Sequence, residues 1–252
     1  MSLAERWRGR PLEETPGSDL IVAALFVRSL NTYVAAVRLC EAGYGEQAAM
    51  LNRSLFEDMA DAHWTVGEPA LAVSLLADHG SHGAMLLADA ARKYPDFFPA
   101  AEIPEYDAAE RTRLDGLFGP HGTKSWTRLN IHERVERIAH HWTDIGAETQ
   151  PLFLYRDIAQ RENNQTLHVS AVALGSTVRE RNDQFVTFRL GPDVDMLDRA
   201  LFGAFWIFSQ TVGLLLDHFS FKVDKAERVA ATDMADFKRP SAGAEPGDPG
   251  PL

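Results

Sequence analysis

The stretch "DLIVAALFVRSLNTYVAAVRLCE" (residues 19–41) decides the fold. Its apolar side chains recur at helical spacing, at Leu20, Ala24, Val27, Leu30, Val34, Val37 and Leu39. Ser18 follows Pro16-Gly17 and is a natural N-cap, and Gly43 lies just beyond the last apolar turn. The stretch therefore predicts a long helix over residues 19–41.

Two further long helices follow it closely. Residues 46–66 and 69–93 have helical apolar patterns, and only Gly67 and Glu68 separate them. Long helices joined by such short turns favour antiparallel neighbours in a bundle.

The second half of the chain predicts shorter elements. We expect helices over residues 108–117, 130–142, 147–175 (either continuous or broken near 163–164) and 195–221. Asn130 and Glu133 have the spacing of a capping box. "FVTFRLGPD" (185–193) alternates apolar and polar residues, which predicts a short extended segment near 185–191: a lone strand, an extended connector, or a hairpin with part of 176–184. The fold class is therefore all-α, a bundle of six or seven helices.

The composition predicts one domain. A chain of 252 residues with 45% hydrophobic residues can bury one good core. We expect an N-terminal extension (1–17), a single helical domain (18–223) and a disordered tail (224–252). The tail ends in "KRPSAGAEPGDPGPL", which has too few apolar residues to offset its ordering entropy.

Charge and cysteine content narrow the function. The net charge of −11 excludes a broad nucleic-acid-coating surface, although a local RNA site remains compatible with it. Cys40 is the single cysteine, so an internal disulfide and a cysteine-type zinc site are excluded. The N-terminus lacks the apolar core of a signal peptide, and "LFGAFWIFSQTVGLLL" (201–216) is shorter than the roughly 20 residues of a membrane span. We expect a cytoplasmic protein with a buried helix there and no membrane contact.

The stretch "RENNQTLHVS" (161–170) holds the first candidate site. On a helix, Arg161 and His168 lie two turns apart on one face, with Asn164 between them. A histidine can transfer protons near neutral pH, and an arginine can stabilise charge on a phosphate, as metal-independent RNA cleavage requires. The same spacing also fits a polar stripe on an ordinary helix.

A second polar group lies in "LNRSLFEDMADAHW" (51–64). Arg53 and Glu57 are four residues apart, so they form either a surface ion pair or an inward-facing pair at a site. The hydroxyl of Tyr155 is a candidate for the same pocket. A metal site built from Glu57, His79 and His82 is a weaker alternative, and the chain has no Glu-x-x-His motif of the di-iron type.

The segments "LNRSLFEDMADAHW", "KSWTRLNIHERVERIA" (124–139) and "LYRDIAQRENNQTLHVSA" (154–171) resemble a large, mostly uncharacterised bacterial family. That family has an Arg-x-x-x-Glu helix and a later tyrosine followed by His-x-Ser. The wider group is similar to the HEPN superfamily of helical bundles, whose signature is an arginine separated by four to six residues from a histidine. This resemblance covers roughly residues 20–220.

The resemblance implies a metal-independent endoribonuclease of toxin–antitoxin or phage-defence systems, without a cofactor. It implies RNA as substrate, a homodimer in which the two Arg–His helices face each other, and an antitoxin or defence-system protein as partner. Arg161 and His168 would be catalytic, Asn164 would orient the substrate, and Arg53, Glu57 and Tyr155 would line the pocket. The rival interpretation is a noncatalytic protein- or ligand-binding module in which Arg53, Glu57, Tyr155 and His168 form a structural polar cluster.

Overall fold

The computed structural model describes residues 16–94, 96, 105–144, 148–159, 178–181, 186–188, 191, 194 and 196–220. Most of the expected N-terminal extension and the expected disordered tail (224–252) lie outside these residues. The described chain contains seven α-helices, one π-helical turn and two short strands. The predicted all-α class is confirmed.

The helices are α2 (Gly17–Glu41), α3 (Gly45–Gly67), α4 (Pro69–Lys93), α5 (Ala108–Phe118), α6 (Ile131–Asp144), α7 (Gln150–Leu154) and α10 (Leu197–His218). The π-helical turn η3 (Tyr155–Ala159) continues directly from α7. Strands β1 (Val178–Arg181) and β2 (Val186–Phe188) form an antiparallel hairpin. The extended segment predicted near 185–191 therefore contains a strand, and of the three alternatives it forms the hairpin with part of 176–184.

The predicted N-terminal cap of α6 is confirmed, and the predicted cap of α2 is wrong. The backbone N–H of Asn130 donates to Glu133 Oε2 (2.8 Å), and the backbone N–H of Glu133 donates to Asn130 Oδ1 (3.0 Å), so the capping box of α6 is confirmed. Ser18 is not the N-cap of α2, because the helix already begins at Gly17 and Pro16 occupies the cap. Ser18 is instead buried in the first turn.

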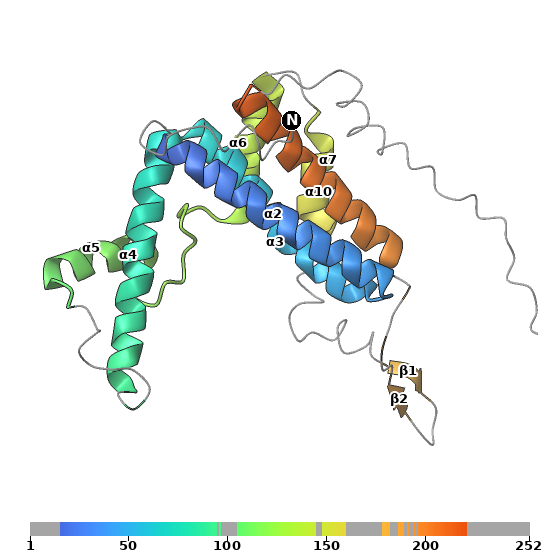
Figure 1. The fold of residues 1–252 in the computed structure, drawn as a ribbon, viewed down its shortest axis with the longest axis horizontal. Helices are drawn as coiled ribbons and strands as arrows, with labels where there is room; N and C mark the ends of the chain where they lie inside the picture. The colour runs from blue at the N-terminus through green and yellow to red at the C-terminus, as the bar shows by residue number, and fades with distance from the viewer. Residues whose placement is uncertain are drawn as a thin grey trace, which may run out of the picture.

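Helix α3 lies at the centre of the bundle, packed against α2, α6 and α10 (Figure 1). Helix α2 runs antiparallel to α3, as the short Ala42–Tyr44 turn predicted, and α10 runs alongside both of them. The main core joins α3 to α6, α7 and α10 through Leu55, Phe56, Met59, Val135, Ile138, Leu152, Ala204 and Ile207. This core holds together segments that are far apart in the chain.

Two glycines let α10 approach α3 closely. A Cβ at Gly45 would lie 2.7 Å from the backbone nitrogen of Leu197, and a Cβ at Gly203 would lie 2.7 Å from Asn52 Nδ2. The same Nδ2 donates to the carbonyl of Ala200 at 2.8 Å. The Asn52 side chain therefore fixes the register of the α3–α10 contact from within the core.

Helices α4 and α5 form an arm beside the central bundle (Figure 1). A second cluster, composed of Trp64, Ala72, Leu75, Met85, Leu114 and Phe118, fills the space between α3, α4 and α5. The half of α4 beyond α5 extends away from α2 (Figure 1). The arm therefore has its own small core.

Two helices pass a length and hydropathy test for crossing a membrane. Over 18 residues the mean hydropathy of α2 is 1.8 and that of α10 is 1.4, and 28% and 39% of these windows are buried inside the protein. Helix α10 does supply the core residues expected of it, although Leu201 and Phe202 at its start are exposed. The core helix of a soluble protein also passes this test.

A largely buried carboxylate on α3 connects the bundle to the chain between α5 and α6. Asp61 Oδ2 accepts a hydrogen bond from Trp126 Nε1 (2.7 Å), and Asp61 Oδ1 pairs with Arg134 Nη1 of α6. Burial raises the pKa of Asp61, and Arg134 and Trp126 act in the opposite direction by favouring the carboxylate. The two partners therefore compensate much of the cost of burying this charge.

We predict that Arg134→Met destabilises the fold by about 3–5 kcal/mol, because it leaves the Asp61 charge buried with too few partners. Chemical denaturation monitored by circular dichroism measures the change. The double variant Asp61→Asn/Arg134→Met should regain part of the loss, because no buried charge remains. Arg137→Met is the control, since Arg137 and its partner Glu68 are both half exposed. Equal losses at positions 134 and 137 would contradict the role of the buried pair.

Candidate functional site

The predicted site residues fall into two groups. Arg161, Asn164 and His168 lie outside the described residues, so their arrangement stays a prediction. Arg53, Glu57 and Tyr155 are described, on α3 and η3.

Arg53 and Glu57 form an ion pair along one side of α3. Arg53 Nε donates to Glu57 Oε1 at 3.1 Å, and the two side chains are 29% and 34% exposed. The pair is thus neither a fully solvated surface pair nor a sealed core pair. Its cation is fixed in direction by the carboxylate and is still accessible to a ligand.

Tyr155 lies against the same part of α3. Its ring packs on Phe56 with centroids 4.6 Å apart and on Trp206 of α10 at 5.6 Å. Phe56 is fully buried and belongs to the same helix as Arg53 and Glu57. The structure therefore pairs Arg53 with Glu57 and packs Tyr155 on another residue of the same helix, and a pocket shared by the three stays a prediction.

The tyrosine is carried by a π-helical turn, which the sequence analysis did not anticipate. Such turns inside α-helices are rare and are found frequently at functional sites. Arg156 fastens this turn: its guanidinium pairs with Glu136 of α6 (2.7 Å) and Asp157 (2.7 Å) and lies 4.8 Å above the Phe153 ring. No spacing in the sequence indicated that Arg156 would pair across to α6.

Three carboxylates along α3 each pair with an arginine. Besides Glu57 with Arg53 and Asp61 with Arg134, the buried Asp58 pairs with Arg28 of α2 (2.7 Å). Burial raises the pKa of Asp58 from 3.8 to about 6, with Arg28 acting in the opposite direction. Two of the three pairs tie α3 to neighbouring helices, and the Arg53–Glu57 pair alone lies within α3.

His63 is a partly buried histidine whose ring nitrogens have no hydrogen-bond partner among the described residues. Both ring nitrogens are inaccessible, and the ring meets Trp142 of α6 edge-on at 5.6 Å. Burial, with a smaller contribution from the neighbouring His141, lowers the pKa of His63 from 6.5 to about 4. The imidazole is therefore neutral at physiological pH, and its role is packing between α3 and α6.

Glu57, His79 and His82, the predicted metal ligands, do not form a metal-binding group in the described part of the chain. Within the described ranges, no group of three or more His, Cys, Asp or Glu side chains is arranged to hold a metal ion. His82 is buried and pairs with Asp115 of α5 at 3.0 Å, and His79 packs on Phe118. Glu57 pairs with Arg53 instead.

The fold is that of an all-helical protein, and its central helix α3 carries three ion pairs. Over residues 19–185, about two thirds of the chain, the sequence matches a family of unknown function, DUF5677, and the protein belongs to that family. The matched region includes α2 to η3 and the stretch with Arg161 and His168. No curated protein and no solved structure matches the chain.

We predict that His63 weakens the fold in acid. Between pH 6.5 and 4 His63 is protonated in the unfolded chain but stays neutral in the folded protein. The free energy of unfolding therefore falls as the pH falls, and this group contributes roughly 3 kcal/mol to the decrease. His63→Phe should remove this contribution. The raised pKa of Asp58 has the opposite effect on stability, but it is present in both proteins and cancels in the difference.

Urea denaturation of wild type and His63→Phe at pH 7 and pH 4 measures this difference. The stability of wild type relative to the variant should fall by roughly 3 kcal/mol between the two pH values. His132→Phe, at an exposed position on α6, is the control and should show little pH-dependent difference. A constant difference for His63→Phe would show that the ring titrates normally.

Proposed function

We propose that this protein is a metal-independent endoribonuclease of the HEPN type, acting in the cytoplasm in a toxin or phage-defence role. Arg161 and His168 are its catalytic residues, and Asn164 orients the substrate. The observation that supports this most is the partly exposed Arg53–Glu57 ion pair on α3, the helix on which Tyr155 packs. The segment that leaves η3 at Ala159 reaches Arg161 two residues later.

The residues suit cleavage by the 2′-hydroxyl of the RNA itself. His168 accepts the 2′-hydroxyl proton or protonates the leaving 5′-oxygen, and Arg161 stabilises the charge that develops on the phosphate. Arg53, held in place by Glu57, adds a second cation for an adjacent phosphate. A local site of this kind is compatible with a net charge of −11, because RNA contact is confined to the pocket.

A second candidate function is a noncatalytic module that binds a protein partner, such as an antitoxin or another defence protein. The exposed apolar side chains of α2, among them Val27 and Val34, favour this alternative. In that case Arg53, Glu57, Tyr155 and His168 are structural. The two candidates differ in whether His168 is needed for RNA cleavage.

We expect purified wild-type protein to degrade RNA in the presence of a chelator and to slow growth when overexpressed. His168→Ala and Arg161→Ala should each reduce cleavage roughly 100-fold or more, because each removes a group that acts in the transition state. Gel analysis of a labelled RNA measures the rates. His132→Ala is the control at an exposed histidine of α6. If the catalytic variants and wild type have equal rates, the protein is not this ribonuclease.

A further prediction concerns Arg53. Arg53→Met should lower RNA cleavage about tenfold or more, because it removes the cation that binds the phosphate adjacent to the scissile one. Arg38→Met is the matched control, since Arg38 also pairs with a glutamate of its own helix, Glu41, and is exposed. The same loss in both variants would indicate a general effect of charge on RNA binding.

A further inference from the structure

The chain that leaves α10 starts at the first turn of α2. His218 Nε2, at the end of α10, lies 2.9 Å from Asp19 Oδ1, in the first turn of α2. The next residue, Phe219, packs with Val22 of α2 in a small buried cluster. Ser220 then has a φ of 51°, and a residue in this left-handed conformation ends a helix and redirects the chain. The residues after Ser220 therefore start beside α2 and in a new direction.

Residues 222–238 (KVDKAERVAATDMADFK) have the pattern of an amphipathic helix. At 100° per residue, an arc of about 80° contains only apolar residues, and every charged residue of the segment lies outside it. The residues on this arc are Val223, Ala226, Ala230, Met234 and Phe237. The disorder expected over 224–252 rests on prolines and glycines, and the first of these is Pro240. The segment before Pro240 therefore predicts a helix with one apolar side.

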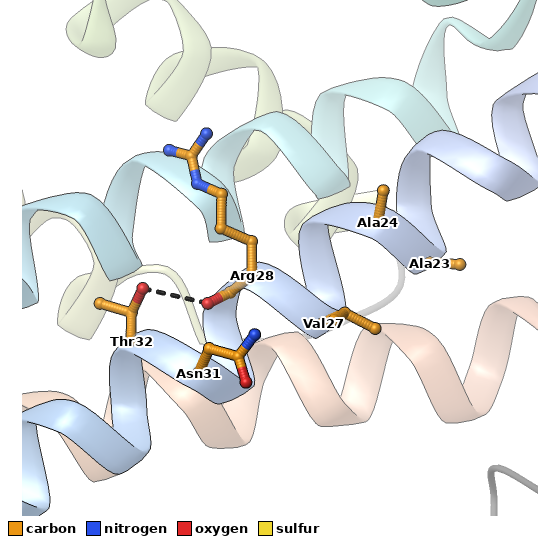
Figure 2. Close-up of a pocket in the computed structure, with 6 residues that line it drawn as sticks. All are labelled: Ala23, Ala24, Val27, Arg28, Asn31 and Thr32. Carbon is orange, nitrogen blue, oxygen red and sulfur yellow. Dashed lines mark hydrogen bonds between the residues drawn. The ribbon is translucent and has the colours of Figure 1, made fainter.

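Helix α2 has an apolar stripe on the side that faces away from the bundle. Val27 is 54% exposed and Val34 is 48% exposed. Figure 2 shows the middle of this stripe, at Ala23, Ala24 and Val27. We call the whole set the outer stripe; its members are Leu20, Ala23, Ala24, Val27, Leu30 and Val34.

The apolar residues of the segment repeat at the spacing of the outer stripe. Positions 20, 27 and 34 of α2 are seven residues apart, and so are positions 223, 230 and 237 of the segment. Apolar residues also occupy positions between them, at 23, 24 and 30 in α2 and at 226 and 234 in the segment. A seven-residue repeat lets two helices pack side by side along their length. At 1.5 Å per residue both stripes are about 21 Å long, so they match from end to end.

The area of the outer stripe suits a segment of the same chain. Helix α2 is about 37 Å long and presents a face roughly 10 Å wide, or about 400 Å². This is about half of the area that each partner buries in a stable complex of separate chains. A short covalent connection instead holds a segment at an effective concentration in the millimolar range, so a smaller contact is sufficient.

Residues 1–15 also join α2 at this end, but their sequence fits the stripe less well. Gly9 and Pro11 interrupt any helix there, because proline lacks the backbone N–H and glycine is a poor helix former. An apolar stripe of about 21 Å therefore cannot form in one helix of this extension.

We propose that residues 222–238 form a helix that packs on the outer stripe, parallel to α2, with Ala230 beside Val27. The direction follows from the start of the segment at the first turn of α2. This contact does not depend on the proposed ribonuclease chemistry. It covers the apolar surface that the noncatalytic candidate offers to a protein partner, so such a partner must first displace the helix.

Disulfide trapping in the full-length protein tests the register. In a Cys40→Ala background, Val27→Cys/Ala230→Cys should form a disulfide within one chain, measured by mass spectrometry of the oxidised monomer. Val27→Cys/Thr232→Cys is the matched control, since Thr232 lies on the opposite side of the predicted helix and only two residues further along. The first pair should react about tenfold faster or more, because packing raises its effective concentration.

Hydrogen exchange gives an independent test. In wild type, residues 223–237 should exchange about tenfold or more slower than residues 241–252. Val27→Asp should remove this protection, because the contact would bury a charge. Leu87→Asp is the control: Leu87 is 63% exposed on the part of α4 that extends away from α2, so this variant should keep the protection. Circular dichroism verifies that both variants are folded.

Several results would overturn the proposal. Equal trapping rates for the two cysteine pairs would show that the segment has no fixed register on α2. Equal exchange of residues 223–237 and 241–252 in wild type, or protection that survives Val27→Asp, would show that the segment does not pack on the outer stripe. Disulfides between two chains, or protection that depends on protein concentration, would assign the surface to a second copy instead.

Discussion

The carboxylate of Asp61 is the constraint on which much of the described fold depends. It is largely buried on the central helix α3, and it accepts hydrogen bonds from Trp126 and from Arg134 of α6. A buried charge must be matched closely by its partners, so it restricts how α6 and the chain before it can sit against α3. Since α7 and η3 follow α6 in the chain and Arg156 of η3 pairs with Glu136 of α6, this constraint extends to the position of Tyr155.

Two carboxylates of α3 hold neighbouring helices in place, and a third belongs to the candidate site. Asp58 and Asp61 pair with arginines of other helices, and burial raises the pKa of both carboxyl groups. Glu57 instead pairs within the helix and remains partly exposed. The two interhelical pairs therefore fix the helix that carries the partly exposed cation Arg53. A scaffold of this kind can orient a bound phosphate without itself rearranging.

The sequence predicted those features that local interactions determine. The ends of α3 and α4 and the capping box of α6 depend on neighbouring residues, so periodicity and spacing located them closely. The pairing of Asp61 with Trp126 and Arg134 spans 65 and 73 positions, and no local pattern encodes it. The position of His63, which has no hydrogen-bond partner in the described part of the chain, and the π-turn at Tyr155 likewise follow from tertiary packing. The contact of Tyr155 with α3 was expected from a family resemblance rather than from spacing.

Analysis of RNA ends tests the central claim, that the residues around α3 and η3 support metal-independent cleavage. Wild-type protein is incubated with a defined RNA in excess chelator, and the products are identified by mass spectrometry. Attack by the 2′-hydroxyl predicts fragments with 2′,3′-cyclic phosphate and 5′-hydroxyl ends. Intact RNA, or fragments with 3′-hydroxyl and 5′-phosphate ends, would contradict the account.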